Sequence, residues 1–253
     1  MMADSDQVIA EWLCSELRSL ADSNFVDRSQ RYFHEDINAL GVSNRLVTAL
    51  VREFDKRYIE VTAEQRLVLA KTILEHHEYH EEVLLAFALL HRVARRGLND
   101  EFHSVAHSWI ESYVSNWAQC DDMCLKLLFA FLMGHIHTIP STKDWVWSRS
   151  PWARRAANVA VVKFVRRKVG SHTVQLPLDH VWSNCLALMT DDHYYVQKGC
   201  GWLLKVAGAV HQAAVADFVA CHVNDLHRDT FRYAIESQPA ASRRYLMALK
   251  GVR

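Results

Sequence analysis

The chain has 253 residues, half of them apolar, and its 29 basic residues balance its 29 acidic residues. This length and composition support a substantial core, and we expect a single domain spanning residues 1–253. The zero net charge excludes a globally basic nucleic-acid binder, so any such surface must be a local patch. The chain has no apolar run of membrane-spanning length and no apolar signal region, and its six cysteines mostly lie in apolar helical patterns. We therefore predict a cytoplasmic protein with reduced thiols, no membrane association and a monomeric state.

Helical periodicity dominates the chain, and its few glycines and prolines leave little to punctuate strands. In the first half the pattern predicts helices over Val8–Leu20, 28–39, Leu46–Phe54, 62–74, 79–95 and Asn99–Tyr113. Gly41 is a predicted C-cap, Ser43 or Asn44 a helix start, and Thr62 to Gln65 a capping box. Helical hairpins of roughly 35 to 45 residues recur, as in HEAT-type repeats. We predict an all-α HEAT-like solenoid of about six helix pairs, curved and right-handed, with a concave face and no β-sheet beyond chance.

The histidine-rich run from Glu75 to Glu81 lies at a predicted helix junction. His76 and His80 are four residues apart, a spacing that can hold zinc on a helix. The His-Glu-x-x-His motif is absent, because Glu81 stands four residues after His77, and no third ligand is evident. We therefore interpret the run as a solvated helix junction and predict no metal and no cofactor.

The stretch Asn116–Cys124, which reads Asn-Trp-Ala-Gln-Cys-Asp-Asp-Met-Cys, places an indole and a carboxylate one helical turn apart. Trp117 and Asp121 stand at i and i+4 and share a face. Both stabilise positive charge, the carboxylate by Coulomb attraction and the indole through its quadrupole. The alternative is that Trp117 is a core residue and Asp121 caps the next helix. Cys120 and Cys124 also share a face, but no second cysteine pair accompanies them, and we interpret them as packing residues.

The region 143–168 concentrates positive charge and contains one acidic residue, Asp144. Its cationic residues are Lys143, Arg149, Arg154, Arg155, Lys163, Arg166, Arg167 and Lys168. Ser150-Pro151 predicts a helix start that places Trp152 and Arg155 in the first turn. Arginine and unpaired backbone N–H groups at a helix start can hold a phosphate. The alternative is an ordinary solvated basic face.

A second cationic face is predicted between Asp191 and Lys205. Lys198, Trp202 and Lys205 fall at i, i+4 and i+7, so an indole lies between two cations. Gly199 and Gly201 are poor helix formers. Their presence within a helix indicates close approach of another backbone, either a neighbouring helix or a ligand. A core tryptophan among small packing residues is the alternative.

Together these segments resemble the AlkD-type DNA alkylation repair proteins, which are glycosylases built of HEAT-like repeats. The resemblance is carried by Trp117-Ala-Gln-Cys-Asp121, Trp152-Ala-Arg-Arg155-Ala-Ala and Val196-Gln-Lys-Gly-Cys-Gly-Trp202-Leu-Leu-Lys205. A weaker match is Arg31-Tyr32-Phe33 followed by Leu40-Gly41-Val42. The similarity covers nearly the whole chain, in the family's order and spacing.

The resemblance implies roles for these residues on a concave DNA-binding face. Asp121 matches the family's catalytic aspartate, and Trp117 and Trp202 match tryptophans that line the cleft beside the damaged nucleotide's sugar. The residues that we predict to bind DNA are Arg155, Arg154, Trp152, Lys198, Lys205, Tyr32 and Arg45. Two positions depart from the family: Lys205 replaces the arginine of the best-known members, and Ser43 replaces a larger polar residue of some members. These departures bear on phosphate geometry and cleft contacts and leave the carboxylate in place.

The activity that the resemblance implies is excision of cationic N3- and N7-alkylated purines from duplex DNA, as in base excision repair, without a cofactor. In a bacterium the protein would then be nucleoid-associated. An alkylated purine that is already cationic leaves as a neutral base, so the reaction needs no general acid. It needs stabilisation of an oxocarbenium-like sugar, which Asp121 supplies while orienting water. The alternatives are a non-catalytic HEAT-like protein that binds DNA structures and a protein-binding helical scaffold, neither of which needs Asp121.

Overall fold

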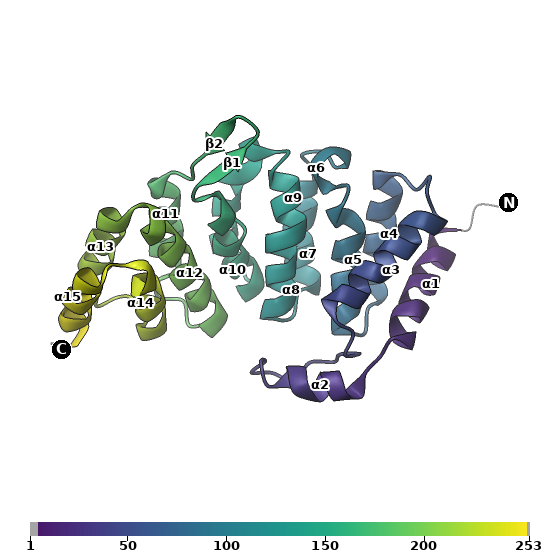
Figure 1. Ribbon diagram of the computed structural model, residues 1–253, viewed down its shortest axis with the longest axis horizontal. Helices are drawn as coiled ribbons and strands as arrows, with labels where there is room; N and C mark the ends of the chain where they lie inside the picture. The colour runs from purple at the N-terminus through teal and green to yellow at the C-terminus, as the bar shows by residue number, and fades with distance from the viewer. Residues whose placement is uncertain (1–4, 252–253) are drawn as a thin grey trace. The chain divides into compact units, whose positions relative to one another are not determined.

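The computed structural model describes residues 5–251, and helices make up nearly all of its regular structure (Figure 1). The all-α fold class predicted from the sequence is confirmed. The chain divides into two compact units, with the boundary between His135 and Ile136. The single domain and the curved stack of helix pairs stay predictions. Among the described residues, none of the helices combines the length and apolar character needed to cross a bilayer.

The first unit is built from helices that bury phenylalanine and leucine side chains between them. Its helices are α1 (Asp6–Ser19), α2 (Ser23–Gln30), α3 (Asn44–Arg57), α4 (Ala63–His76), α5 (His80–His91), α6 (Ala94–Gly97), α7 (Phe102–Tyr113), α8 (Trp117–Asp122), the π-helical segment η1 (Met123–Leu128) and α9 (Phe129–Leu132). Helix α5 packs against α3, α4, α8 and η1, and is therefore central to the unit. Phe87 of α5 is fully buried, as are Phe54, Phe102 and Phe131 elsewhere in the unit.

Local sequence signals place several helix starts correctly. At α4 the capping box is confirmed, because the Gln65 N–H donates to Thr62 Oγ1 (3.2 Å) and the Thr62 N–H donates to Gln65 Oε1 (2.9 Å). Ser43 is the N-cap of α3. Ser150 caps the helix that begins at Pro151, where its Oγ accepts from the Ala153 N–H. These signals act within one turn, which is why the sequence alone reveals them.

The helix predicted over 28–39 is wrong. Helix α2 starts earlier, because the Asp22 carboxylate accepts from the N–H groups of Asn24 and Phe25, and it ends at Gln30. Residues 31–43 form a loop. Gly41 therefore caps no helix; it lies in the left-handed region (φ 78°), and a Cβ there would lie 2.1 Å from the Asp22 carbonyl oxygen. Similarly, the helix predicted over 79–95 is divided into α5 and α6.

The second unit combines helices with one short hairpin. Its elements are the 3₁₀ segment η2 (Ile136–Trp147), α10 (Pro151–Val159), η3 (Val162–Phe164), β1 (Arg167–Val169), β2 (His172–Val174), α11 (Leu178–Leu188), α12 (Tyr194–Val210), α13 (Gln212–Cys221), α14 (Arg228–Ala234), η4 (Ile235–Ser237) and α15 (Ala240–Gly251). Helix α12 packs against α10, α11, α13 and α14. It therefore holds the same central place in its unit that α5 holds in the first.

The sequence predicted no β-sheet beyond chance, and it gave no place to the one short hairpin found in residues 5–251. Strands β1 and β2 pair antiparallel, with Val169 opposite His172 (Figure 1). The two residues between them are Gly170, whose φ is 62°, and Ser171. A two-residue turn with a glycine at positive φ is a hairpin turn, and β-branched residues follow and precede it. Gly170-Ser171 is therefore a local hairpin signal within a chain whose other segments have helical periodicity.

Gly199 and Gly201 of α12 confirm the predicted close approach of another backbone, and in both cases the partner is a neighbouring helix. A Cβ on Gly201 would lie 2.9 Å from Tyr233 Cβ and 3.1 Å from the Thr230 carbonyl oxygen, both in α14. A Cβ on Gly199 would lie 3.5 Å from the Arg155 carbonyl oxygen in α10, which is an ordinary contact distance. Of these two glycines, only Gly201 is therefore required by packing.

This difference predicts opposite effects for two matched substitutions. Gly199→Ala should raise the free energy of unfolding by up to about 1 kcal/mol, because alanine is the better helix former and the space exists. Gly201→Ala should lower it by about 1–3 kcal/mol, because the added methyl group overpacks the contact with α14. Urea denaturation of both variants measures the effects. Equal changes in the two variants would contradict the assigned packing.

Candidate functional site

Asn116 starts the helix that carries Trp117 and Asp121. Its side-chain Oδ1 accepts from the N–H groups of Ala118 (3.1 Å) and Gln119 (3.0 Å), so Asn116 is the N-cap of α8. Helix α8 then continues without a break through η1 into α9. Asp121 lies within this helix and not at its start, so the alternative that Asp121 caps a helix is wrong.

The two adjacent carboxylates after Cys120 have different surroundings. Asp122 is buried and accepts from Lys126 Nζ, which also donates to Asn44 Oδ1 (3.3 Å). Burial raises the pKa of Asp122, while the Lys126 ammonium group acts in the opposite direction. Asp121 is half-buried, one helical turn from Trp117 on the same face. The π-helical segment begins directly after this pair, and such segments are frequent at functional sites.

Trp117 is held by the loop 31–43. Its indole N–H donates to the Tyr32 carbonyl oxygen (3.2 Å), and its ring stacks on Phe33 with centroids 5.4 Å apart. Trp117 is half-buried, whereas the Tyr32 side chain is 60% exposed beneath the Arg31 guanidinium. The structure therefore brings the weak motif Arg31-Tyr32-Phe33 against the stronger motif that begins at Trp117.

The histidine-rich run is not a solvated junction throughout, which corrects the interpretation made from the sequence. His80 Nδ1 lies 3.1 Å from Asn116 Nδ2, and the His80 carbonyl oxygen accepts from Gln119 Nε2 (3.3 Å). Because Asn116 uses its oxygen for the helix cap, its amide nitrogen must be the donor and His80 Nδ1 the acceptor. Glu81 and Glu82 next to it are buried. Within residues 5–251, no cluster of three or more His, Cys, Asp or Glu side chains forms a metal-binding group.

In the second unit, Trp152 and Arg155 lie in the interior. Trp152 packs against the rings of His193 (5.3 Å between centroids) and Tyr195 (5.6 Å). Arg155 is 5% exposed, and its Nη1 donates to the Tyr195 carbonyl oxygen (2.7 Å). Their contacts with DNA stay predictions, and this burial does not favour them.

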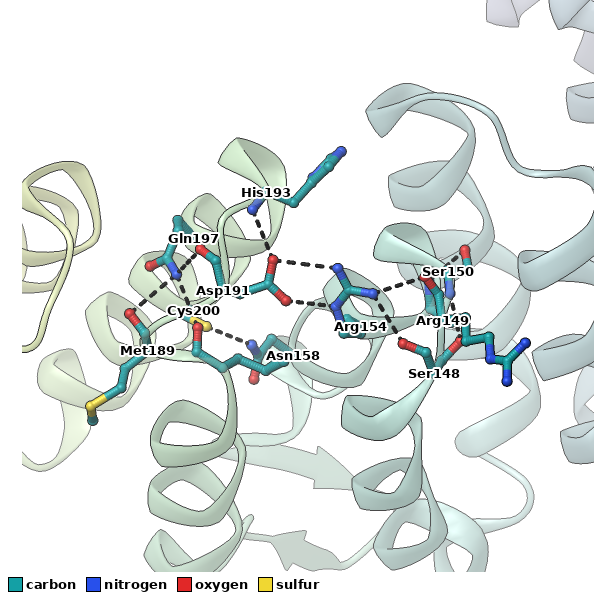
Figure 2. A network of polar contacts seen from close by, with 12 residues as sticks. Ser148, Arg149, Ser150, Arg154, Asn158, Met189, Asp191, His193, Gln197 and Cys200 are labelled. Atoms are coloured by element: carbon teal, nitrogen blue, oxygen red, sulfur yellow. Dashed lines mark hydrogen bonds and ion pairs between the residues drawn. The ribbon is translucent and has the colours of Figure 1, made fainter.

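Arg154 is the centre of a polar network that joins the start of α10 to the start of α12 (Figure 2). Its guanidinium donates to Asp191 through Nε (2.6 Å) and to the carbonyl oxygens of Ser148 (3.0 Å) and Arg149 (2.9 Å). Asp191 in turn accepts from the His193 N–H (2.8 Å). Most donors of Arg154 are therefore used inside the protein.

The remaining predicted DNA-binding residues are more accessible. Lys198 lies over the Tyr194 ring (5.3 Å from the centroid), and Lys205 forms an ion pair with Glu236 (2.5 Å). The hydrogen bond to Glu236 raises the pKa of Lys205. Trp202 is half-buried, and Arg45 is exposed in the first turn of α3. Within the cationic run, Lys163, Arg166, Arg167 and Lys168 are exposed.

Two features of the first unit were missed in the sequence. Asn116 could have been recognised, because asparagine is a preferred N-cap and directly precedes the helical stretch. The ion pair of Asp122 with Lys126 also fits an i, i+4 spacing. Asp122 and Lys126 line a cavity of about 320 Å³, together with Arg52 and His91. The cavity itself depends on α3 and α5, so no sequence signal could have found it.

Comparison with known proteins identifies the family. The family model of the DNA alkylation repair enzyme matches residues 13–237. The chain belongs to the DNA alkylation repair enzyme family. The resemblance seen in the motifs is thereby confirmed, and the match spans both units, from α1 to η4.

One solved structure shares the fold of this DNA alkylation repair family member. It is described as a predicted DNA alkylation repair enzyme from Enterococcus faecalis. It matches with a TM-score of 0.72 at 14% sequence identity, over 85% of this chain and 95% of that chain. No curated protein sequence matches this chain.

The contact between His80 and Asn116 predicts a pH dependence for this family member. Burial lowers the pKa of His80, with the Glu81 carboxylate acting in the opposite direction. Below the ordinary histidine pKa of about 6.5, His80 is therefore protonated in the unfolded chain but stays neutral in the folded protein. The free energy of unfolding should be fully retained above that pH and should fall as the pH approaches the lowered pKa of the folded state.

The matched control is His80→Gln, which keeps an acceptor for Asn116 and cannot titrate. Urea denaturation of both proteins at about pH 7.5 and about pH 5.5, on either side of the ordinary histidine pKa, measures the difference. Wild type should lose more stability than His80→Gln between these conditions. The same loss in both would mean that His80 titrates normally.

Proposed function

We propose that this family member is a DNA glycosylase that excises cationic N3- and N7-alkylated purines from duplex DNA. The observation that supports this most directly is the pair formed by Trp117 and Asp121 on one face of α8. Asp121 is a half-buried carboxylate within a helix that Asn116 already caps, so it has no structural role at the helix start. Membership of the DNA alkylation repair enzyme family supplies the substrate class.

In the proposed reaction the glycosidic bond breaks first. Its electron pair goes to the alkylated purine, which loses its positive charge and leaves as a neutral base. The sugar becomes oxocarbenium-like, and the Asp121 carboxylate stabilises that positive charge. Water then forms a bond to the anomeric carbon and releases a proton, with Asp121 orienting the water.

Trp117 contributes a second stabilising group. An indole face attracts a cationic sugar or base by about 0.5–2 kcal/mol, which is weaker than a well-placed carboxylate. The stacking of Trp117 on Phe33 and its hydrogen bond to the Tyr32 carbonyl oxygen fix the orientation of the ring. A ring that is already fixed loses little conformational entropy when it contacts the substrate. Trp117 is therefore pre-organised to stabilise the cationic sugar or base.

The contacts with DNA are assigned to the exposed cations. Arg154 and Arg155 use their guanidinium groups on Asp191 and on backbone carbonyl oxygens. Lys163, Arg166, Arg167 and Lys168 remain exposed in and before β1. We therefore assign most phosphate contacts of the 143–168 region to these four residues and a structural role to Arg154 and Arg155.

The first prediction from this function concerns the chemical step. Asp121→Asn should keep the fold and most of the DNA affinity but lose roughly 100- to 1,000-fold in the excision rate, about 3–4 kcal/mol. Single-turnover release of 7-methylguanine from alkylated DNA measures this rate.

The matched control is Asp122→Asn at the neighbouring position. It removes the ion pair with Lys126 and should lower stability, while leaving the single-turnover rate within a few-fold of wild type. Wild-type excision by Asp121→Asn would refute the mechanism and favour a protein that binds DNA structures without catalysis.

The second prediction concerns salt. Binding through phosphate contacts releases counterions, so the affinity for duplex DNA should fall steeply with salt concentration. Arg167→Ala should reduce the slope of log affinity against log salt by about 0.9, the value for one lost phosphate contact. Arg167→Lys keeps the charge and should keep the slope. Equal slopes for wild type and Arg167→Ala would remove the hairpin from the DNA-binding surface.

A further inference from the structure

The Glu81 carboxylate accepts hydrogen bonds from three consecutive backbone N–H groups of the loop 31–43. Its Oε2 accepts from Leu40 (2.8 Å), and its Oε1 accepts from Gly41 (2.8 Å) and Val42 (3.0 Å). The Glu81 residue is only 3% exposed. Buried N–H groups must be paired, and a carboxylate that accepts several of them forms strong charge-assisted bonds. Glu81 therefore fixes this end of the loop.

The part of the loop between Phe33 and Leu40 is held in place by further hydrogen bonds. The Asn38 carbonyl oxygen accepts from the His80 N–H (2.7 Å), and Asn38 Nδ2 donates to the Glu78 carbonyl oxygen (2.8 Å). Gln30 then spans the bend, donating to the Glu35 carbonyl oxygen (2.8 Å) and accepting from the Ile37 N–H (3.2 Å). The loop is thus held at both ends, despite containing no helix or strand.

The other end of the loop carries the contacts that orient Trp117. These are the Tyr32 carbonyl oxygen, which accepts from the indole N–H, and the Phe33 ring, on which the indole stacks. Phe33 also meets the His80 ring edge-on, with centroids 5.9 Å apart. The first turn of α5 therefore supports the loop from Phe33 to Val42.

We infer that Glu81 is a positioning residue that acts through the loop 31–43 to orient Trp117 beside Asp121. The carboxylate is buried and acts through the loop: it sets the position of Tyr32 and Phe33, and these set the orientation of the indole. The inference rests on the proposed function for its catalytic consequence. Its structural part, the control of the Trp117 orientation by Glu81, stands independently.

Glu82 offers a matched control on the neighbouring position. It is also fully buried, and its carboxylate also accepts backbone N–H groups, from Glu78 (2.8 Å) and Tyr79 (3.1 Å). It additionally accepts from Arg18 Nε (2.8 Å) in α1. Glu82 thus has the same chemistry as Glu81 but holds the start of its own helix and α1 rather than the loop.

The test compares Glu81→Gln with Glu82→Gln. In Glu81→Gln the new amide N–H₂ replaces one acceptor oxygen, so at least one of the three N–H groups faces a donor. The indole N–H of Trp117 is followed by ¹H–¹⁵N NMR in the free protein, with its resonance identified by its loss in Trp117→Phe. The single-turnover rate of 7-methylguanine excision and the affinity for alkylated DNA are measured in parallel.

Both variants should lower thermal stability, but they should differ at Trp117. In Glu81→Gln we expect the indole resonance to shift, its exchange with solvent to accelerate, and the excision rate to fall roughly 10- to 100-fold with affinity nearly unchanged. Glu82→Gln should leave the indole signal and the bound-state rate as in wild type. If Glu81→Gln does not fold, Glu81→Asp, which keeps both acceptor oxygens on a shorter side chain, takes its place with the same expected direction.

The outcomes separate the two proposals. An unchanged indole resonance in the folded Glu81 variant, or the same change in both variants, would overturn the positioning role. A shifted indole in Glu81→Gln alone supports that role even if Asp121→Asn excises at the wild-type rate, in which case the proposed function fails by itself.

Discussion

The first unit depends on the way in which the N-terminal turn of α5 pairs polar groups outside its own helix. Glu81 pairs the N–H groups of the loop, and His80 accepts from the Asn116 side chain that caps α8. Each buried donor left without these partners would cost about 1–3 kcal/mol, so the loop and α8 have little freedom to move independently. The first turn of α5 thus positions both the start of α8, which carries Trp117, and the loop 31–43, which carries its contacts Tyr32 and Phe33.

In the second unit, the same requirement to pair buried donors determines which cations are used inside the protein. Arginine has five donors in a fixed fork, and a buried guanidinium must pair most of them. Arg154 does so with Asp191 and two carbonyl oxygens, and the buried Arg155 donates to the Tyr195 carbonyl oxygen. A cationic motif in a sequence therefore does not by itself show which residues form a binding surface. The charge that remains for a polyanion lies at exposed positions such as Arg167 and Lys168.

Differences between neighbouring residues carry much of the functional argument. Asp121 and Asp122 are adjacent, yet only Asp122 is buried in an ion pair with Lys126. Glu81 and Glu82 are adjacent, yet one holds a distant loop and the other its own helix start. Along a helix, successive side chains point about 100° apart, so neighbours in the sequence meet different surroundings. Position on the helix therefore separates a candidate catalytic group from a structural one.

The sequence by itself determined the helical class, the helix starts at Thr62 and Ser150, and the family through its three motifs, because these depend on spacing and on contacts within one turn. It could not determine that residues 31–43 form a loop, since the N–H groups of Leu40, Gly41 and Val42 bond to Glu81 about 40 positions away. It also could not separate Arg155, which is buried, from Arg167, which is exposed. Only the tertiary structure decided these points, because burial and long-range hydrogen bonding arise when helices pack against one another.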